Sequence, residues 1–236
     1  MGRVQVVPTA DALASAAATM IGSRIASGLN TGARFALALS GGRTPAETYR
    51  RLAALPILDA AKWSRVEIYF ADERAVPPDH ADSNYRLVRE ALIEPARLAP
   101  RNVYRISGED PDLDRVAAAY EAKLPARLDL VVLGIGEDGH TASIFPRSPA
   151  AGEAIRRVVA VSDSPKPPPR RVTLTLRGLR DARDALVLAS GEAKAEAVWR
   201  ALRAETDPLE VPARLVRERE WILDEAAASW LDAPGG

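Results

Sequence analysis

The sequence predicts an α/β fold with an open, mostly parallel sheet and helices on both of its faces. Short apolar runs alternate with helical patterns along the chain, which is the order expected of repeating strand, helix and strand units. The run LDLVVLGIG at residues 128–136 is apolar on both faces, as a central parallel strand covered by helices requires. The chain has 236 residues and no linker or low-complexity stretch divides it, so we expect a single domain over residues 1–236.

The expected elements alternate from the N-terminus onward. Strands are expected at residues 4–7, 34–39, 66–70, 103–106, 128–134, 158–161, 172–176, 185–189 and 221–223. Helices are expected at residues 11–27, 45–55, 83–93, 113–124 and 192–203. The proline cluster from Pro165 to Pro169 excludes a helix or a central strand and predicts a stiff surface loop.

Charge and composition exclude several classes of protein. Basic and acidic residues balance at 32 each, so no long-range field favours a nucleic acid or an anionic membrane as partner. The absence of cysteine excludes disulfides and thiol nucleophiles, and two histidines supply a transition-metal centre poorly. The first twenty residues resemble neither a signal peptide nor a membrane span. We therefore expect a cytoplasmic protein with no metal, and the sequence leaves its protein partners open.

The segment LVVLGIGEDGHTASIFP, residues 130–146, contains the leading catalytic candidate. An apolar strand runs directly into a glycine-rich turn that carries Asp138 and His140. Ligands of open α/β sheets bind beyond the carboxyl ends of the strands, so this order places a titratable imidazole where chemistry usually takes place. The alternative is an ordinary surface histidine, because histidine placement indicates function only in some proteins.

The segment ALSGGRTPAETYRRL, residues 38–52, predicts an anion-binding turn between a strand and a helix that is expected to begin at Pro45. Gly41 and Gly42 let the backbone approach a ligand, and their N–H groups together with the helix N-terminus can hold a phosphate. Ser40 and Thr44 add hydroxyl donors. The alternative is a tight turn without a ligand, and the Walker spacing G-x-x-x-x-G-K-[ST] is absent.

The segment IYFADERAVPPDHADSN places the charged triplet DER at the end of another strand. Asp72 is a candidate substrate contact that can position a hydroxyl or a cation. Arg74 can meet a phosphate or a developing oxyanion through its fixed guanidinium donors. The alternative is a solvated charge cluster. His80 lies among turn-forming residues and is expected to be an exposed loop histidine, and Ser83 is expected to cap the following helix.

Gly134, Gly136 and Gly139 also match the dinucleotide pattern G-x-G-x-x-G. That pattern requires a long helix that starts at the third glycine, whereas Pro146 and Pro149 follow within ten residues. The expected context is missing, so nucleotide binding is not the preferred interpretation.

Taken in order, the segments SGGRTP, DERAVPPDHADSN, GIGEDGHTASIFP, RRVTLTL and GEAKAEAV resemble the 6-phosphogluconolactonase family of the pentose phosphate pathway. The resemblance spans nearly the whole chain, and the combination is specific although each piece alone is not. It implies a modified Rossmann-like fold, shared with glucosamine-6-phosphate deaminases and ribose-5-phosphate isomerases. It also implies hydrolysis of 6-phospho-D-glucono-1,5-lactone to 6-phospho-D-gluconate without a metal or organic cofactor.

Hydrolysis of a δ-lactone needs an activated water, a stabiliser for the developing oxygen charge and a grip on the distal phosphate. By resemblance, His140 is the general base and Asp138 orients the loop or the substrate. Arg74 is implied in the site, on the phosphate or on the charged carbonyl oxygen. A G-x-S-x-G elbow is absent, so an acyl-enzyme is not indicated. The residues implied around the phosphate are Ser40, Gly41, Gly42 and Thr44, with Arg171 and Lys194 as cationic partners.

Two rival functions remain open on the sequence. An aminosugar-6-phosphate deaminase or isomerase would share the fold and the phosphate loop, but that family typically carries an aromatic residue where Arg74 stands. The other rival is a non-catalytic sugar-phosphate-binding module, and the intact pair of Asp138 and His140 argues against it.

Overall fold

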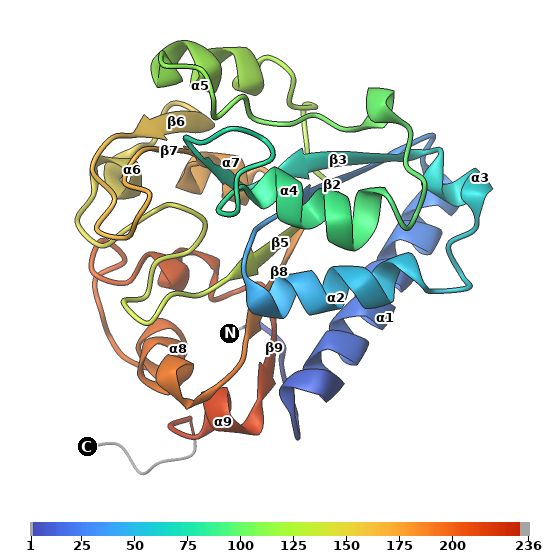
Figure 1. The fold of residues 1–236 in the computed structure, drawn as a ribbon. Helices are drawn as coiled ribbons and strands as arrows, with labels where there is room; N and C mark the ends of the chain where they lie inside the picture. Colours follow the sequence, from blue (N-terminus) through green and yellow to red (C-terminus); the bar gives the residue numbers. More distant parts are fainter. Residues whose placement is uncertain (1, 232–236) are drawn as a thin grey trace.

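The computed structural model describes residues 2–231, which form two sheets surrounded by helices (Figure 1). The larger sheet has six strands in the order β1-β9-β8-β5-β2-β3, and each neighbouring pair is parallel. These strands are β1 (Val4–Val7), β2 (Phe35–Leu39), β3 (Val66–Phe70), β5 (Leu130–Gly134), β8 (Asp184–Ala189) and β9 (Glu220–Asp224). The smaller sheet is antiparallel in the order β4-β7-β6, and its strands are β4 (Asp72–Arg74), β6 (Val158–Val161) and β7 (Arg171–Leu174).

The central strands of the larger sheet are covered on both faces. Every residue of β2 is buried, as is every residue of β5 except Gly134. Successive side chains of a strand point to opposite faces, so continuous burial requires a cover on each side. This confirms the predicted α/β fold with a mostly parallel sheet and helices on both faces.

Most helices begin where the sequence supplies a capping side chain. Thr9, Asp59, Ser83 and Asp112 each accept a hydrogen bond from the backbone N–H three residues ahead. The predicted cap at Ser83 is thereby confirmed. No helix within residues 2–231 is long and apolar enough to cross a membrane. The α-helices are α1 (Ala10–Thr31), α2 (Arg43–Ala53), α3 (Ala60–Trp63), α4 (Asn84–Val88), α5 (Leu113–Glu121), α6 (Pro149–Gly152), α7 (Leu176–Arg180), α8 (Ala195–Leu202) and α9 (Glu225–Ala228). The other helical turns are η1 (Arg89–Ile93), η2 (Pro100–Asn102), η3 (Glu192–Lys194) and η4 (Pro212–Val216).

Several expected elements differ in the structure. No strand forms at 103–106, where Val103 makes only an isolated bridge to Ile68. The helix expected at 83–93 is α-helical only to Val88 and continues as the π-helix η1. The strands near 158–161 and 172–176 belong to the smaller sheet, where they pair with the DER triplet, which is itself the short strand β4.

Helix α2 begins two residues before the expected start at Pro45. Pro45 occupies the third helical position, where a backbone N–H has no partner within the helix, so the proline removes no hydrogen bond. The earlier start brings Arg43 into the first turn of the helix. The capping residue is Gly42, which provides no side-chain hydrogen bond.

The order of the strands creates a crevice beside the middle of the larger sheet. Strands β2 and β5 are parallel neighbours, with Leu39 opposite Val132. From β2 the chain continues to β3 on one side, and from β5 it continues to β8 on the other. The loops that leave the two strands therefore diverge, and such switch points are where open α/β sheets bind ligands.

Candidate active site

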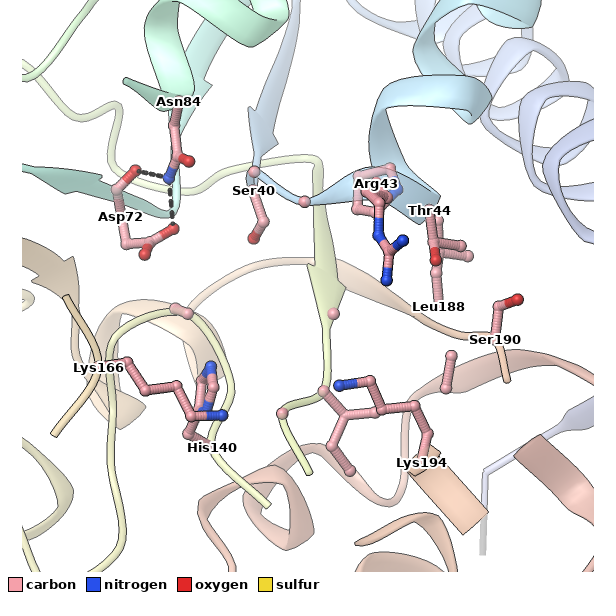
Figure 2. Close-up of a pocket in the computed structure, with 18 of the residues that line it drawn as sticks. Ser40, Arg43, Thr44, Asp72, Asn84, His140, Lys166, Leu188, Ser190 and Lys194 are labelled. Carbon is pink, nitrogen blue, oxygen red and sulfur yellow. Dashed lines mark hydrogen bonds between the residues drawn. The ribbon is translucent and has the colours of Figure 1, made fainter. Parts of the chain in front are cut away.

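A cavity of about 260 Å³ opens beyond the carboxyl ends of β2 and β5 (Figure 2). Five segments line it, within residues 40–45, 72–84, 134–142, 166–171 and 188–194. Among the described residues in this lining, Asp72 is the one carboxylate. The cationic residues in the lining are Arg43, Arg74, Lys166, Arg171 and Lys194. An excess of positive charge in a recessed site favours an anionic ligand, although the chain as a whole is neutral.

His140 reaches the cavity from the turn that follows β5. Its Nδ1 lies 2.5 Å from Oδ1 of Asp138, and its ring packs against Phe145 with centroids 4.6 Å apart. The turn needs glycine at position 136, because a Cβ there would lie 2.0 Å from Nδ1 of His140. The N–H of Gly136 donates to the carbonyl of His140 at 2.8 Å, which closes the turn. The imidazole is thus fixed on both sides by its own short loop.

Asp138 is held as a carboxylate. Burial acts to raise the pKa of Asp138, but the hydrogen bond and charge of His140, with the charge of Lys166, outweigh it and the pKa lies well below its usual value. An ionised Asp138 accepts the Nδ1–H of His140, which leaves Nε2 as the nitrogen with a free lone pair. Lys166 approaches the same Oδ1 at 3.4 Å. This arrangement can take a proton from a water molecule in the cavity.

The loop after β2 presents hydrogen-bond donors to the cavity. Ser40 is 4% exposed, and its Oγ has no hydrogen-bond partner among residues 2–231. A Cβ on Gly41 would lie 1.8 Å from Oδ1 of Asn84, and Gly42 has a φ of 111°, so neither position accepts a larger residue without strain. The hydroxyl of Tyr49 donates to the carbonyl of Ser40 at 2.8 Å and holds the loop from below. The loop is therefore shaped as the predicted anion-binding turn requires.

The smaller sheet places the DER triplet at another wall of the cavity. Asp72 is buried; its Oδ1 accepts from the Asn84 amide at 3.0 Å and its Oδ2 accepts from the Ser143 hydroxyl at 2.6 Å. Arg74 donates to the carbonyl of Asp82 at 2.6 Å, while its buried Nε has no partner among the described residues. Asp72 and Glu73 are buried and Arg74 is half-buried, so the triplet is not a solvated charge cluster. Arg74 keeps donors that a ligand can use.

Glu73 fixes the return of the chain from β4 to α4. Its buried carboxylate accepts from the Asn84 N–H at 2.8 Å, the Tyr85 N–H at 2.7 Å and the Ser83 hydroxyl at 3.1 Å. Burial raises the pKa of Glu73, and the backbone hydrogen bonds act in the opposite direction. Through these bonds Glu73 sets the position of Asn84, which in turn holds Asp72.

Arg171 lies in the cavity wall as expected, but most of its donors are engaged. The guanidinium donates to the carbonyls of Lys166, Pro167 and Pro168 at 2.9, 3.2 and 3.0 Å. Another N–H reaches the Ser143 hydroxyl at 3.4 Å, and the guanidinium lies over the Phe145 ring. Four of the five N–H groups of an arginine are thus used within the protein. Burial lowers the pKa of Arg171 despite the nearby charge of Asp72.

Lys194 enters the cavity from η3, in the loop after β8. Its side chain is one quarter exposed, and Nζ lies 3.3 Å from Oε1 of Glu137. The start of this loop is fixed by Asp224, which accepts from the Ser190 hydroxyl at 2.5 Å and from the Gly191 N–H at 3.0 Å. Lys194 therefore lines the cavity, as the sequence predicted.

The structure brings the predicted site residues together. Asp138 contacts His140, while His80 lies in an exposed loop outside the cavity lining, where its Nδ1 accepts from the Asp82 N–H. The predicted residues in the lining are Ser40, Gly41, Gly42, Thr44, Asp72, Arg74, His140, Arg171 and Lys194.

The cavity also contains Arg43, Asn84, Lys166 and Ser190, which no motif had assigned to the site. Arg43 lies inside SGGRTP, and Lys166 is one of only four lysines in the chain, so each had a weak signal. The role of the proline cluster was missed, because this loop carries Lys166 into the site instead of serving only as a connector.

Two alternatives find no support in this geometry. The helix that follows Gly139 is α6, which has four residues, so the long helix of a dinucleotide site is missing there. Among residues 2–231 no three His, Asp or Glu side chains are grouped so as to hold a metal ion.

The fold and the cavity define an α/β protein in which a histidine–carboxylate pair and a glycine-rich turn at the start of a helix lie at one cationic cavity. The family model described as "Glucosamine-6-phosphate isomerases/6-phosphogluconolactonase" matches residues 8–225. The chain belongs to this family.

Within this family, the chain is similar to proteins named 6-phosphogluconolactonase. The chain is 40% identical to the human 6-phosphogluconolactonase over 248 residues, covering 99% of this chain and 95% of the human protein. It is 36% identical to the 6-phosphogluconolactonase of Mycobacterium tuberculosis, covering 97% of this chain and 98% of that protein. The structure of 6-phosphogluconolactonase from Trypanosoma cruzi superposes with a TM-score of 0.86 at 30% identity, covering 99% of this chain and 98% of that one.

Proposed function

We propose that this protein hydrolyses 6-phospho-D-glucono-1,5-lactone to 6-phospho-D-gluconate in the oxidative branch of the pentose phosphate pathway, in the cytoplasm. The observation that carries the proposal is one cavity that is lined both by His140, which contacts Asp138, and by the glycine-rich turn after β2. The similarity to 6-phosphogluconolactonases from human and bacterial sources, over nearly the full length, supports the same reaction. A deaminase or isomerase of the same fold is not favoured by these relatives.

The reaction begins with water. His140 Nε2 takes a proton as the water oxygen attacks C1 of the lactone, and the electron pair of the C=O bond moves to the carbonyl oxygen. Arg74 and Lys166, which line the cavity with His140, supply positive charge for this oxyanion. The oxyanion then collapses, the bond between C1 and the ring oxygen breaks, and protonated His140 returns its proton to that ring oxygen. The product is an open-chain acid whose carboxyl group ionises.

The phosphate grip is assigned to the turn after β2. Ser40, Gly41, Gly42 and Thr44 surround the phosphate with hydroxyl and N–H donors, and Lys194 supplies charge. Asp72, held by Asn84 and Ser143, presents a fixed carboxylate edge to the sugar hydroxyls. The protein's own residues provide each function that the hydrolysis requires.

The test is a lactonase assay on the wild type and two histidine variants. The lactone is generated in situ and its loss is followed above the spontaneous rate, with glucosamine 6-phosphate assayed in parallel for ammonia. We expect His140→Ala to lower kcat by about 10²- to 10⁴-fold, the usual contribution of a positioned general base. The matched control His80→Ala removes the other histidine, which lies outside the cavity, and should leave kcat unchanged.

Circular dichroism of His140→Ala should match the wild type, since the ring is not part of the main core. Ammonia release without lactone hydrolysis would refute the proposed function. Turnover of His140→Ala close to that of the wild type would remove the histidine from its role.

A further inference from the structure

The cavity has two ends with different chemistry (Figure 2). His140 and Lys166 lie at one end, Arg43 lies near Thr44 at the other, and Lys194 extends its Nζ into the space between them. In the lactone of the proposed function, the phosphorus is separated from C1 by the ring oxygen, C5, C6 and the ester oxygen. With C1 beside His140, the phosphate therefore reaches toward the end where Arg43 lies.

Arg171 belongs to the His140 end. Its guanidinium lies over the ring of Phe145, which itself packs against the His140 ring. Its hydrogen bonds to three consecutive carbonyls, from Lys166 to Pro168, hold the proline loop in place. A guanidinium with four N–H groups already engaged has little left for a dianion at the far end of the cavity.

Arg43 is in the opposite situation. Its side chain is exposed at the rim and lines the cavity, and its guanidinium has no hydrogen bond or ion pair within residues 2–231. Glu47, the acid of α2, is engaged by Arg50 and Arg51 and does not neutralise it. The positive charge of Arg43 thus has no acidic partner among residues 2–231, and it lies next to the cavity.

Hydrogen-bond donors that have no partner in the described part of the chain lie close to Arg43, and such donors favour an anion. Helix α2 has 11 residues and starts at Arg43 without a side-chain cap, so the N–H groups of its first turn are open toward the cavity. The buried Ser40 hydroxyl points into the same space and has no partner among the described residues. An unpartnered buried hydroxyl costs free energy unless a ligand satisfies it.

We propose that Arg43 is a substrate-binding residue that determines specificity for the phosphorylated lactone, with Lys194 as its partner across the phosphate. Arg171, in contrast, is a positioning residue that acts through the proline loop and Lys166. This assignment rests on the proposed function for the identity of the substrate. A guanidinium can bind phosphate through two parallel hydrogen bonds, which a lysine cannot reproduce.

The experiment compares two substrates in four proteins: the wild type, Arg43→Ala, Arg43→Lys and Arg50→Ala. For Arg43→Ala we expect KM for the phosphorylated lactone to rise about 10- to 100-fold with kcat nearly unchanged, because the phosphate is bound alike in ground and transition states. Hydrolysis of unphosphorylated glucono-1,5-lactone should not change. Arg43→Lys should recover part of the loss. Arg50→Ala is the matched control, since Arg50 is exposed on the same helix and pairs with Glu47.

Calorimetric titration with 6-phosphogluconate and with gluconate separates this inference from the proposed function. Arg43→Ala should weaken binding of 6-phosphogluconate by the same factor and leave binding of gluconate as in the wild type. If the wild type binds 6-phosphogluconate in this manner but hydrolyses neither lactone, the proposed function fails and the role of Arg43 stands. An unchanged KM and unchanged binding in Arg43→Ala, or equal losses on both substrates, would overturn the role of Arg43.

Arg171→Ala tests the other half of the assignment. It should lower kcat on both lactones, because the loop that carries Lys166 loses its support. A rise in KM confined to the phosphorylated lactone would instead place Arg171 on the phosphate and overturn the division of roles.

Discussion

Asp138 determines which nitrogen of His140 faces the cavity. Its carboxylate accepts the hydrogen bond of the Nδ1–H, so the lone pair of Nε2 is free to accept a proton from the water of the proposed mechanism. An asparagine at position 138 can turn its amide NH2 toward Nδ1 and favour the wrong tautomer. In the proposed mechanism Asp138 therefore acts through His140, as a positioning residue.

We expect Asp138→Asn to lower kcat by about 10²- to 10⁴-fold, since it removes the organisation of the general base. The pH profile provides the specific readout. The lowered pKa of Asp138 keeps its carboxylate ionised in weakly acidic solution. Because only a neutral imidazole accepts a proton, kcat/KM of the wild type should rise with pH through the range in which histidine side chains titrate.

The spontaneous hydrolysis of the lactone must be subtracted at each pH. A wild-type profile that is flat between about pH 5.5 and 8 would contradict general-base catalysis by histidine and favour a carboxylate.

The sequence predicted His140 and Asp138 because both lie in one short segment whose glycines and strand are visible locally. Lys166 and Asn84 were missed for the opposite reason. Lys166 approaches Asp138 from 28 positions away, and Asn84 reaches Asp72 across a loop. Contacts of this kind depend on tertiary packing, and no local pattern records them.

Short elements show the same dependence on context. The triplet DER has no apolar alternation, yet it forms β4 because β7 pairs with it, with Glu73 opposite Val172. The run at 103–106 has the composition of a strand but makes only one bridge, beside the edge strand β3. Pairing partners, more than intrinsic propensity, decided both cases. The long apolar strands were predicted well because burial on both faces leaves an unbroken apolar run.

The connection from β4 to α4 provides a test at this scale. Glu73→Gln places an amide NH2 against backbone N–H groups whose hydrogen bonds the carboxylate accepts, so the N–H of Asn84 or of Tyr85 loses its partner. We expect the free energy of unfolding to fall by about 1–3 kcal/mol in urea denaturation. Glu94→Gln, on an exposed side chain paired with Arg89, is the matched control and should show no measurable change. Equal stability of Glu73→Gln and wild type would contradict the role of Glu73 in this connection.

For the molecule as a whole, charge is distributed unevenly. Acidic and basic residues balance over the chain, but five cations line the cavity with one carboxylate among the described lining residues. The neutral composition predicts no long-range field, so the positive charge is a local property of the cavity. This charge comes from segments far apart in the sequence, which meet because β2 and β5 diverge at the switch point.

This concentration of positive charge has a consequence for the end of the catalytic cycle. Ring opening converts a neutral ester into a carboxylate, so the departing molecule carries one negative charge more than the molecule that entered. A cavity with this charge retains 6-phosphogluconate at least as well as the lactone, and escape of the product becomes a slow step. Accumulated 6-phosphogluconate should therefore compete with the lactone, with an inhibition constant below KM, and added salt should relieve the inhibition. Initial rates measured at increasing concentrations of 6-phosphogluconate would show this inhibition. Initial rates that do not change with the concentration of 6-phosphogluconate would mean that the cavity does not retain the product.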